Sequence, residues 1–408
     1  MELRELLQNI TPPDEAAREQ AHRRWAACAK PLGSLGLLET ALEDIAALTG
    51  DAQAPLLPRA VLVLCADNGV VAQGVTQTDS SVTAAVTRNL AAGRTSVCRM
   101  AQAAQCAVVP VDMGMAGEPV PGVRNCRIAA GTMDFTAGAA MSRAEAVQAI
   151  GEGIALAREL AEDGYRLIAT GEMGIGNTTT SSAVAAVLLG QPVELMTGRG
   201  AGLSDEGLAR KVDAICRGIL KNEPDPEDPL DVLSKLGGFD IAGLCGVFLG
   251  GALEGLPVLM DGFISGVAAL CAVRLCPAAA KAVFASHVSA EPGHSAVLRA
   301  LGKTAYLLPN PGLTDNTAPY FAPYAAPEGF VPERVVSVDI ATPGLLPDNA
   351  RPYEKRIDLA LDHHPSFEGF GRANIVRPKA AACGELVLDI IRELTPLTQE
   401  IALPLYVA

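Results

Sequence analysis

Apolar residues along this chain gather in short continuous runs, each bounded by glycine or polar residues. Runs of this length and composition are typical of strands that are buried on both faces of a sheet. The runs that we interpret as strands are Ala60–Ala66, Ala107–Val111, Arg166–Ala169, Pro257–Met260 and Ala282–Ala285.

Alanine-rich stretches with helical spacing separate these runs, at Val82–Leu90, Arg143–Glu162 and Gly207–Leu220. Strands that alternate with helices form right-handed βαβ crossovers, and these place parallel strands in one sheet with helices on both faces. Residues 1–50 also have helical spacing, which is interrupted at Lys30–Gly36. The pattern predicts an α/β fold: a Rossmann-like three-layer parallel sheet with a smaller helical N-terminal part.

Most of the predicted strands end in a polar or glycine-containing turn. Ligands bind outside the carboxyl ends of the strands in open α/β sheets, so we expect these turns to converge on one crevice. The turns are Ala66–Gly69, Asp112–Gly114, Thr170–Gly174, Asp261–Gly262 and Ser286–His287.

The composition changes near residue 303, where a segment rich in proline, asparagine and aspartate begins. Strand-like runs follow at Arg334–Val338 and Ile357–Leu361, and a helical pattern spans about Ala381–Glu393. We therefore expect three domains. They are a helical part at 1–50, an α/β domain at 51–299 and a partial α/β segment at 300–408.

Charge and composition narrow the functional class. The net charge of −14, without a tight basic patch, argues against a nucleic-acid partner. None of the ten cysteines forms a C-x-x-C pair, which suits a reducing cytosol. The chain shows no signal-peptide pattern and no uninterrupted apolar stretch of membrane-spanning length. We expect a cytoplasmic globular protein without a membrane partner.

The segment Gly171–Thr180 is the sharpest chemical signal in the sequence. A strand leads into a glycine turn and then into hydroxyl residues at the start of a helix, where backbone N–H groups and the helix dipole favour a phosphate. Thr178 and Thr179 can cap the helix or bind the phosphate. An ordinary capped helix explains the same pattern about as well. Glu172 beside an anion site favours acid–base chemistry.

Further candidates are weaker on sequence alone. Arg199, in the glycine-rich segment Thr197–Gly202, and Lys211 on the next helix can neutralise a phosphate, although a flexible loop with surface charges is the alternative. Asp261 and Ser286 each follow a predicted strand. His287 alone is more often a structural histidine than a catalyst.

Residues 1 to about 295 resemble the nicotinate-nucleotide:dimethylbenzimidazole phosphoribosyltransferase family, of the lower-ligand branch of cobalamin biosynthesis. The motifs that carry the resemblance occur in the same order over roughly 70% of the chain. They are Lys30–Gly36, Ala66–Val70, Gly131–Phe135, Ala140–Ser142, Gly171–Thr179, Gly198–Gly200, Leu233–Asp240, Leu259–Phe263 and Ser286–Glu291.

The resemblance implies transfer of ribose 5-phosphate from nicotinate mononucleotide to dimethylbenzimidazole, with inversion at the anomeric carbon. It implies a homodimer, no metal and no cofactor, and an apolar slot for the base near Val82–Asn89. The expected catalytic residue is Glu172. The expected substrate-binding residues are Gly174, Gly176, Asn177, Thr178, Thr179, Gly198, Arg199, Gly200, Lys211, Asp261 and Ser286.

Two departures from the family pattern predict impaired activity. The family's general base is a glutamate in a short C-terminal stretch, which this sequence lacks. Glu172 is then the expected, weaker substitute. Asn68 stands where the family usually has histidine, and an asparagine side chain cannot shuttle a proton.

Residues from about 300 to 408 resemble part of a DHH-family phosphoesterase. The segments that carry this resemblance include Leu361–Pro365 and Ala373–Val376. Asp339, Asp362 and His363 are candidate ligands for Mn²⁺ or Mg²⁺, but the family's opening His/Asp motif is missing. Two readings therefore stand beside the transferase: a metal-dependent phosphoesterase, and an inactive chimera.

Overall fold

The computed structural model describes residues 3–31, 34–287, 289, 291–302, 335–338, 340–346 and 350–378. The chain divides into two compact units, Met1–Thr304 and Ala305–Ala408.

The first unit is built on a six-stranded sheet with the order β3-β2-β1-β4-β5-β6. Every neighbouring pair of strands is parallel. This is the strand order of the Rossmann fold, so the predicted parallel α/β sheet is confirmed. The strands are β1 (Arg59–Ala66), β2 (Cys106–Gly114), β3 (Arg124–Asn125), β4 (Leu167–Met173), β5 (Val258–Met260) and β6 (Val283–Ala285).

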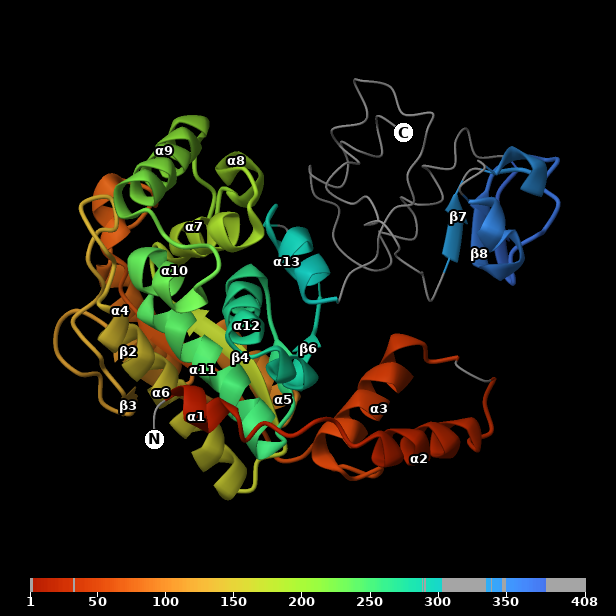
Figure 1. Ribbon diagram of the computed structural model, residues 1–408, viewed down its shortest axis with the longest axis horizontal. Coiled ribbons are helices and arrows are strands. Elements are labelled where there is room, and N and C mark those ends of the chain that lie inside the picture. Colours follow the sequence, from red (N-terminus) through yellow and green to blue (C-terminus); the bar gives the residue numbers. More distant parts are fainter. Residues whose placement is uncertain are drawn as a thin grey trace. The chain divides into compact units, whose positions relative to one another are not determined.

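Helices cover both faces of this sheet, and the central strand shows why. Alternate side chains of a strand point to opposite faces. In β1, Leu62 and Leu64 belong to the main core, whereas Val63 and Cys65 belong to a second buried cluster that includes Leu90. Figure 1 shows α11 and α12 lying across the sheet.

The helices of the first unit follow the predicted spacing closely, and Arg143–Glu162 has the predicted bounds. They are α1 (Leu3–Leu7), α2 (Glu15–Ala26), α3 (Leu37–Thr49), α4 (Ser81–Ala91), α5 (Ser96–Ala103), α6 (Arg143–Glu162), α7 (Asn177–Leu189), α8 (Val193–Met196), α9 (Asp205–Asn222), α10 (Pro229–Leu236), α11 (Phe239–Glu254), α12 (Phe263–Leu275) and α13 (His294–Ala300).

Glycines bring α6 and α11 into backbone contact. A Cβ atom on Gly246 would overlap the carbonyl oxygen of Ile150, and one on Gly153 would overlap that of Gly243. Because no side chain stands between them, the two helices pack closely against each other. This close approach fixes α11, and with it the residues at its N-terminus, against the sheet.

Two predicted turns are strands instead. Pairing with β1 extends β2 to Gly114 and β4 to Met173. The interpretation of 112–114 and 170–173 as turns was therefore wrong, because hydrogen bonds to the neighbouring strand hold polar residues in extended backbone. The short exposed strand β3 has no apolar run and was not predicted.

The second unit holds a separate sheet with the order β7-β8-β9, again all parallel. Its strands are β7 (Val335–Val338), β8 (Ile357–Asp362) and β9 (Ala373–Val376). The first two were predicted and β9 was not. The helix expected at 381–393 lies outside the described residues. Among the described helices, none is long and apolar enough to cross a membrane.

Candidate functional site

The site lies where the strand order reverses, between β1 and β4. From β1 the chain proceeds outward to β2 and β3, and β4 starts the other half of the sheet. The loops that leave β1 and β4 contact each other, since Asn68 Nδ2 donates to the carbonyl oxygen of Ile175 at 3.4 Å. A Cβ atom on Gly174 would overlap the carbonyl oxygen of Ala66. The glycine is therefore required for the two loops to meet.

The glycine turn after β4 leads directly into α7. Gly176 is the N-cap, with φ +95°, a conformation that favours glycine. Of the two roles open to Thr178 and Thr179, helix capping is not observed, because Gly176 holds that position and no side chain makes a capping bond. Two of the expected anion donors are also engaged within the turn. The N–H of Asn177 donates to Gly174 and that of Thr179 to Gly176.

Two carboxyl groups share one amide beside this turn. Asn177 Nδ2 donates to Glu172 Oε2 and, at 3.2 Å, to Asp240 Oδ2. Asp240 is completely buried at the start of α11, whereas Glu172 at the end of β4 is partly accessible. The arrangement places one reachable carboxyl and one enclosed carboxyl on either side of a neutral side chain.

The surroundings make both groups weaker acids than usual. Burial, together with the nearby acidic side chain of Asp240, raises the pKa of Glu172 to about 7, although the Asn177 amide acts in the opposite direction. Burial also raises the pKa of Asp240, against the lowering effect of Asn177 and of the Ile241 N–H. A carboxyl with a pKa near neutrality can both take and release a proton at physiological pH.

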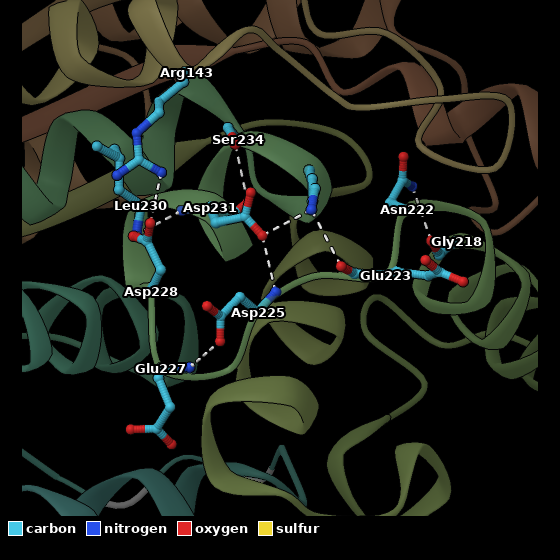
Figure 2. Close-up of polar contacts among 11 residues, drawn as sticks. Arg143, Gly218, Asn222, Glu223, Asp225, Glu227, Asp228, Leu230, Asp231 and Ser234 are labelled. Atoms are coloured by element: carbon cyan, nitrogen blue, oxygen red, sulfur yellow. Dashed lines mark hydrogen bonds and ion pairs between the residues drawn. The ribbon is translucent and has the colours of Figure 1, made fainter.

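The helix before Asp240 is held by the acidic connection between α9 and α10, shown in Figure 2. Asp228 caps α10 by accepting from the backbone N–H groups of Leu230 and Asp231, and its other oxygen accepts from Arg143 Nη1 at 2.7 Å. The side chain of Asp231 accepts from the backbone N–H of Asp225 at 2.8 Å.

The end of α10 is fixed from the other side by residues 131–141. The N–H of Ala140 donates to Lys235 and the N–H of Met141 to Ser234. The same segment returns to β1, since the N–H of Thr132 donates to the carbonyl oxygen of Asp67 at 3.1 Å. These backbone hydrogen bonds connect the end of β1 to the end of α10. Asp240 follows shortly after, at the start of α11.

Lys211 is the buried cation of the site. Its side chain has no exposed surface, and Nζ donates to Thr178 Oγ1 and to the carbonyl oxygen of Gly198, each at 2.9 Å. Burial lowers the pKa of Lys211 to about 8, while Glu291 favours the charged form. The ammonium group therefore lies against the first turn of α7, which brings the predicted residues Lys211, Thr178 and Gly198 together.

Arg199 and Gly200 lie in the same loop but differ in what they do. Gly200 has φ +52°, and a Cβ atom there would approach Thr178 Oγ1 to 3.0 Å, so the glycine admits the loop to the site. The guanidinium of Arg199 donates to the carbonyl oxygen of Leu203 at 2.9 Å and pairs with exposed Asp205. In this structure Arg199 stabilises its own loop.

Asp261 and Ser286 follow β5 and β6 and are exposed. The N–H of Asp261 donates to Thr170 Oγ1 at 3.1 Å, and Ser286 Oγ donates to the carbonyl oxygen of Met260 at 2.7 Å. His287 Nδ1 lies 2.9 Å from Ser286 Oγ and 4.0 Å from Asp261 Oδ1. Both contacts involve the same ring nitrogen, so this is not a relay through the imidazole.

The sequence interpretation missed two buried groups in this part of the molecule. Asp240 was not among the candidate site residues, because nothing local shows that it meets Asn177. His294 is fully buried; its Nδ1 accepts from the N–H of Ser289 at 2.8 Å, and burial lowers its pKa to about 4. The motif Leu233–Asp240 could have suggested Asp240, since it lies within the family resemblance.

The candidate metal ligands of the second unit form no site among the residues that the structure describes. Asp362 is buried, and its Oδ1 accepts from the backbone N–H and from Nδ1 of His364. The His363 ring lies against that of His364, with centroids 4.6 Å apart and the ring planes tilted by 50°. Asp339 lies outside the described residues. No group of three metal-ligating side chains occurs in the described ranges of either unit.

Comparison with known proteins identifies the first unit. A family model described as "Phosphoribosyltransferase" matches residues 10–318. The nicotinate-nucleotide–dimethylbenzimidazole phosphoribosyltransferase of Acetivibrio thermocellus is 47% identical over 285 residues, which cover 70% of this chain and 81% of that protein. The enzyme of the same name from Desulforamulus reducens is 47% identical over 307 residues, 74% of this chain and 86% of its own.

A solved structure shows the same fold. The crystal structure of CobT from Thermus thermophilus superposes with a TM-score of 0.67 at 39% sequence identity, over 70% of this chain and 86% of that one. The likeness to this α/β structure agrees with the parallel sheet of the first unit. This chain belongs to the nicotinate-nucleotide–dimethylbenzimidazole phosphoribosyltransferase family.

Proposed function

We propose that the protein transfers the ribose 5-phosphate group of nicotinate mononucleotide to 5,6-dimethylbenzimidazole. The products are α-ribazole 5′-phosphate and nicotinate, in the lower-ligand branch of cobalamin biosynthesis. One observation carries the proposal: the adjoining residues Asn177 and Thr178 bind Glu172 and Lys211, respectively. The first turn of α7 therefore has an acid–base group on one side and a cation on the other.

The cation side suits the phosphate of the nucleotide. Lys211 donates to two neutral oxygens and is enclosed by protein, so an anion nearby would greatly favour its charged form. The N-terminus of α7 adds partial positive charge at the same place. We assign the phosphate-binding site to Lys211, Thr178 and the loop Gly198–Gly200. Gly174 and Gly176 have no side chains, so they leave room for the phosphate to approach the backbone.

The carboxyl side suits the transfer step. One nitrogen of dimethylbenzimidazole attacks the anomeric carbon, the bond from that carbon to the nicotinate nitrogen breaks, and the electron pair remains on nicotinate. The attacking ring must lose the proton on its other nitrogen, and Glu172 is placed to take it. The pKa of Glu172, raised by burial to about 7, matches this role better than an ordinary carboxylate would. We expect the dimethylbenzimidazole ring to bind near α4. This helix contacts the turn after β4, because Thr83 Oγ1 accepts from the N–H of Ile175 at 3.2 Å.

We propose further that the activity is reduced relative to the family. The C-terminal glutamate of the family has no counterpart in the sequence, which leaves Glu172 as the working base. Asn68 is buried after β1, and its amide does not ionise, so it cannot relay a proton as a histidine would. The expected consequence is slow but measurable transfer.

The test is to incubate the purified protein with both substrates and to follow nicotinate release by chromatography. Glu172→Gln removes the base and keeps the hydrogen-bonding shape. Glu194→Gln, at an exposed position of α8, is the matched control. Release by the wild type and by the control, but not by Glu172→Gln, supports the proposal.

Other outcomes separate the alternatives. If the wild type releases no nicotinate but nicotinate mononucleotide raises its melting temperature, the phosphate site is intact and the base is missing. Neither release nor protection would leave the inactive chimera as the better description.

Two accompanying expectations belong with this proposal. The resemblance implies a homodimer in the cytoplasm. Light scattering on the purified protein checks the first, and fractionation of cells that express it checks the second. A monomer at micromolar concentration would contradict the dimer.

A phosphoesterase activity of residues 300–408 has weaker support than the transferase. The family match extends past the predicted boundary at 299 and reaches residue 318. In the described part of the second unit, Asp362 uses one carboxylate oxygen on His364. Hydrolysis of a phosphodiester that depends on added Mn²⁺ would revive this alternative.

A further inference from the structure

Asp240 is a buried acidic residue for which the proposed transfer has no use. Its side chain has no exposed surface, and its Oδ2 lies 3.2 Å from Asn177 Nδ2. Enclosing a carboxyl group costs free energy, so a fully buried one needs partners that compensate. Its position one side chain away from the proposed base suggests that it acts on that base.

The Asn177 amide has two N–H bonds, and each can serve one carboxyl group. It donates to Glu172 on one side and to Asp240 on the other. The amide thus fixes the separation of the two groups and lets each respond to the charge of the other. Because like charges at such short range oppose each other's ionisation, the pair favours states that keep a proton.

The groups that face this pair do not offset the repulsion. Asp261 at the end of β5 acts on Glu172, and Asp67 at the end of β1 acts on Asp240. The Cys65 thiol of β1 is buried beneath them, and burial raises its pKa to about 12, so it stays neutral. Asp261 and Asp67 are both acidic, so they add to the repulsion between the two carboxyl groups.

An independent observation places the proton. Asn68 Oδ1 is a buried acceptor to which no group in the described part of the chain donates. A Cβ atom on Gly238 would overlap both Asn68 Oδ1 and Asp240 Oδ1, so these two oxygens lie on the same side of that glycine, close together. A carboxylic acid at Asp240 can donate to Asn68 Oδ1, whereas a carboxylate there would face another acceptor.

We propose that Asp240 is a positioning residue that retains one proton, donated toward Asn68, so that Glu172 is the ionised member of the pair and accepts the azole proton. This inference rests on the proposed transferase function. It deepens that function by assigning Asn68 a role that asparagine can fill: it accepts the proton of Asp240 and shuttles none.

The test is the pH dependence of kcat/KM for nicotinate release in Asp240→Asn. Asparagine can accept from Asn177 and donate permanently to Asn68, so the variant imitates the protonated acid. Glu172 then ionises beside a neutral neighbour in both proteins, so the variant stays active and the acidic limb of its profile stays where the wild type has it. Asp213→Asn, on the exposed face of α9, is the control and keeps the wild-type profile.

Identical substrates are used throughout, so their own titration cancels in the comparison. If Asp240 is ionised in the wild type, Asp240→Asn removes a negative charge beside Glu172 and the acidic limb moves to lower pH. Loss of activity with normal folding would show that the ionised form of Asp240 is needed. Either result overturns the inference.

A second measurement applies to the resting wild type, whether or not the variant folds or the transfer occurs. Protein with carbon-13 in its aspartate carboxyl groups should show an infrared band of a protonated buried aspartic acid at pH 7. The band should persist in Asp67→Asn and disappear in Asp240→Asn, and the two results together assign it to Asp240. A spectrum with only ionised aspartates at pH 7 would refute the inference independently of the transferase assay.

Discussion

Lys211 Nζ lies 2.9 Å from Thr178 Oγ1, although the two residues come from different helices of the first unit. The ammonium group of α9 is thereby buried against the N-terminal turn of α7, where the helix dipole is also positive. The Glu291 carboxylate favours the charged form of Lys211, and under the proposed function the nucleotide phosphate is a second anion at this place.

Lys211→Met should weaken binding of nicotinate mononucleotide. A hydrogen bond to a charged group contributes about 1.5–3 kcal/mol, so we expect the Kd to rise by roughly 10- to 100-fold. Titration calorimetry measures the change. Lys221→Met, at an exposed position of the same helix, should bind as the wild type does. Equal affinity of both variants would remove Lys211 from the phosphate site.

Binding of the nucleotide should also depend on pH through Lys211. Burial lowers the pKa of this group to about 8, so the ammonium form is complete below that pH and is lost as the pH rises through it. The wild type should therefore bind less tightly between pH 8 and pH 9.5, and Lys211→Met should lose this dependence. A wild-type affinity that stays constant over that range would show that Lys211 remains charged.

Glu172→Gln should stabilise the protein at pH 8 while abolishing transfer. The pKa of Glu172 in the folded state is about 7, above the ordinary value of 4.5, so folding favours the protonated form. Ionisation of Glu172 therefore destabilises the folded state increasingly as the pH rises from about 4.5 through 7. We expect the variant's advantage in melting temperature to appear at pH 8 and to vanish near pH 4.5. Glu194→Gln should show no such trend.

Gly246→Ala should destabilise the first unit. The added Cβ overlaps the carbonyl oxygen of Ile150, which is backbone and cannot rotate away, so α6 and α11 must separate. We expect a loss of about 1–3 kcal/mol in the free energy of unfolding, measured by urea denaturation. Gly151→Ala lies on α6 in open space and should instead gain about 0.5–1 kcal/mol. Equal effects of the two changes would contradict the close packing.

Asp228→Ala should loosen the connection that positions Asp240 (Figure 2). It removes the N-cap of α10 and the ion pair with Arg143 together, at a cost of about 1 kcal/mol in the free energy of unfolding. Asp228→Asn keeps a capping oxygen and should lose only a few tenths, because the Arg143 pair is largely exposed. Equal losses would assign the stability to the ion pair.

The sequence by itself determined the layers of the fold. Runs such as Ala60–Ala66 and helices such as Arg143–Glu162 can be recognised from the local spacing of apolar residues. A buried strand shows a continuous apolar run, and an amphipathic helix shows apolar residues at helical spacing. Glu172 and Thr178 were named as candidates from sequence, since a glycine turn at a helix start is a local pattern, and Lys211 was named as a cation on the helix after the glycine-rich segment Thr197–Gly202.

Only the tertiary structure decided which of these groups act together. The Asn177 amide meets Asp240 across 63 positions of the chain, and no local pattern reports such a contact. Arg199 is a different case, because its positive charge suggested a phosphate ligand but its partners Leu203 and Asp205 lie only four and six positions further along the chain. Residue type and periodicity are local properties, whereas burial and charge coupling arise when the strand order brings β1, β4 and the start of α11 to one point.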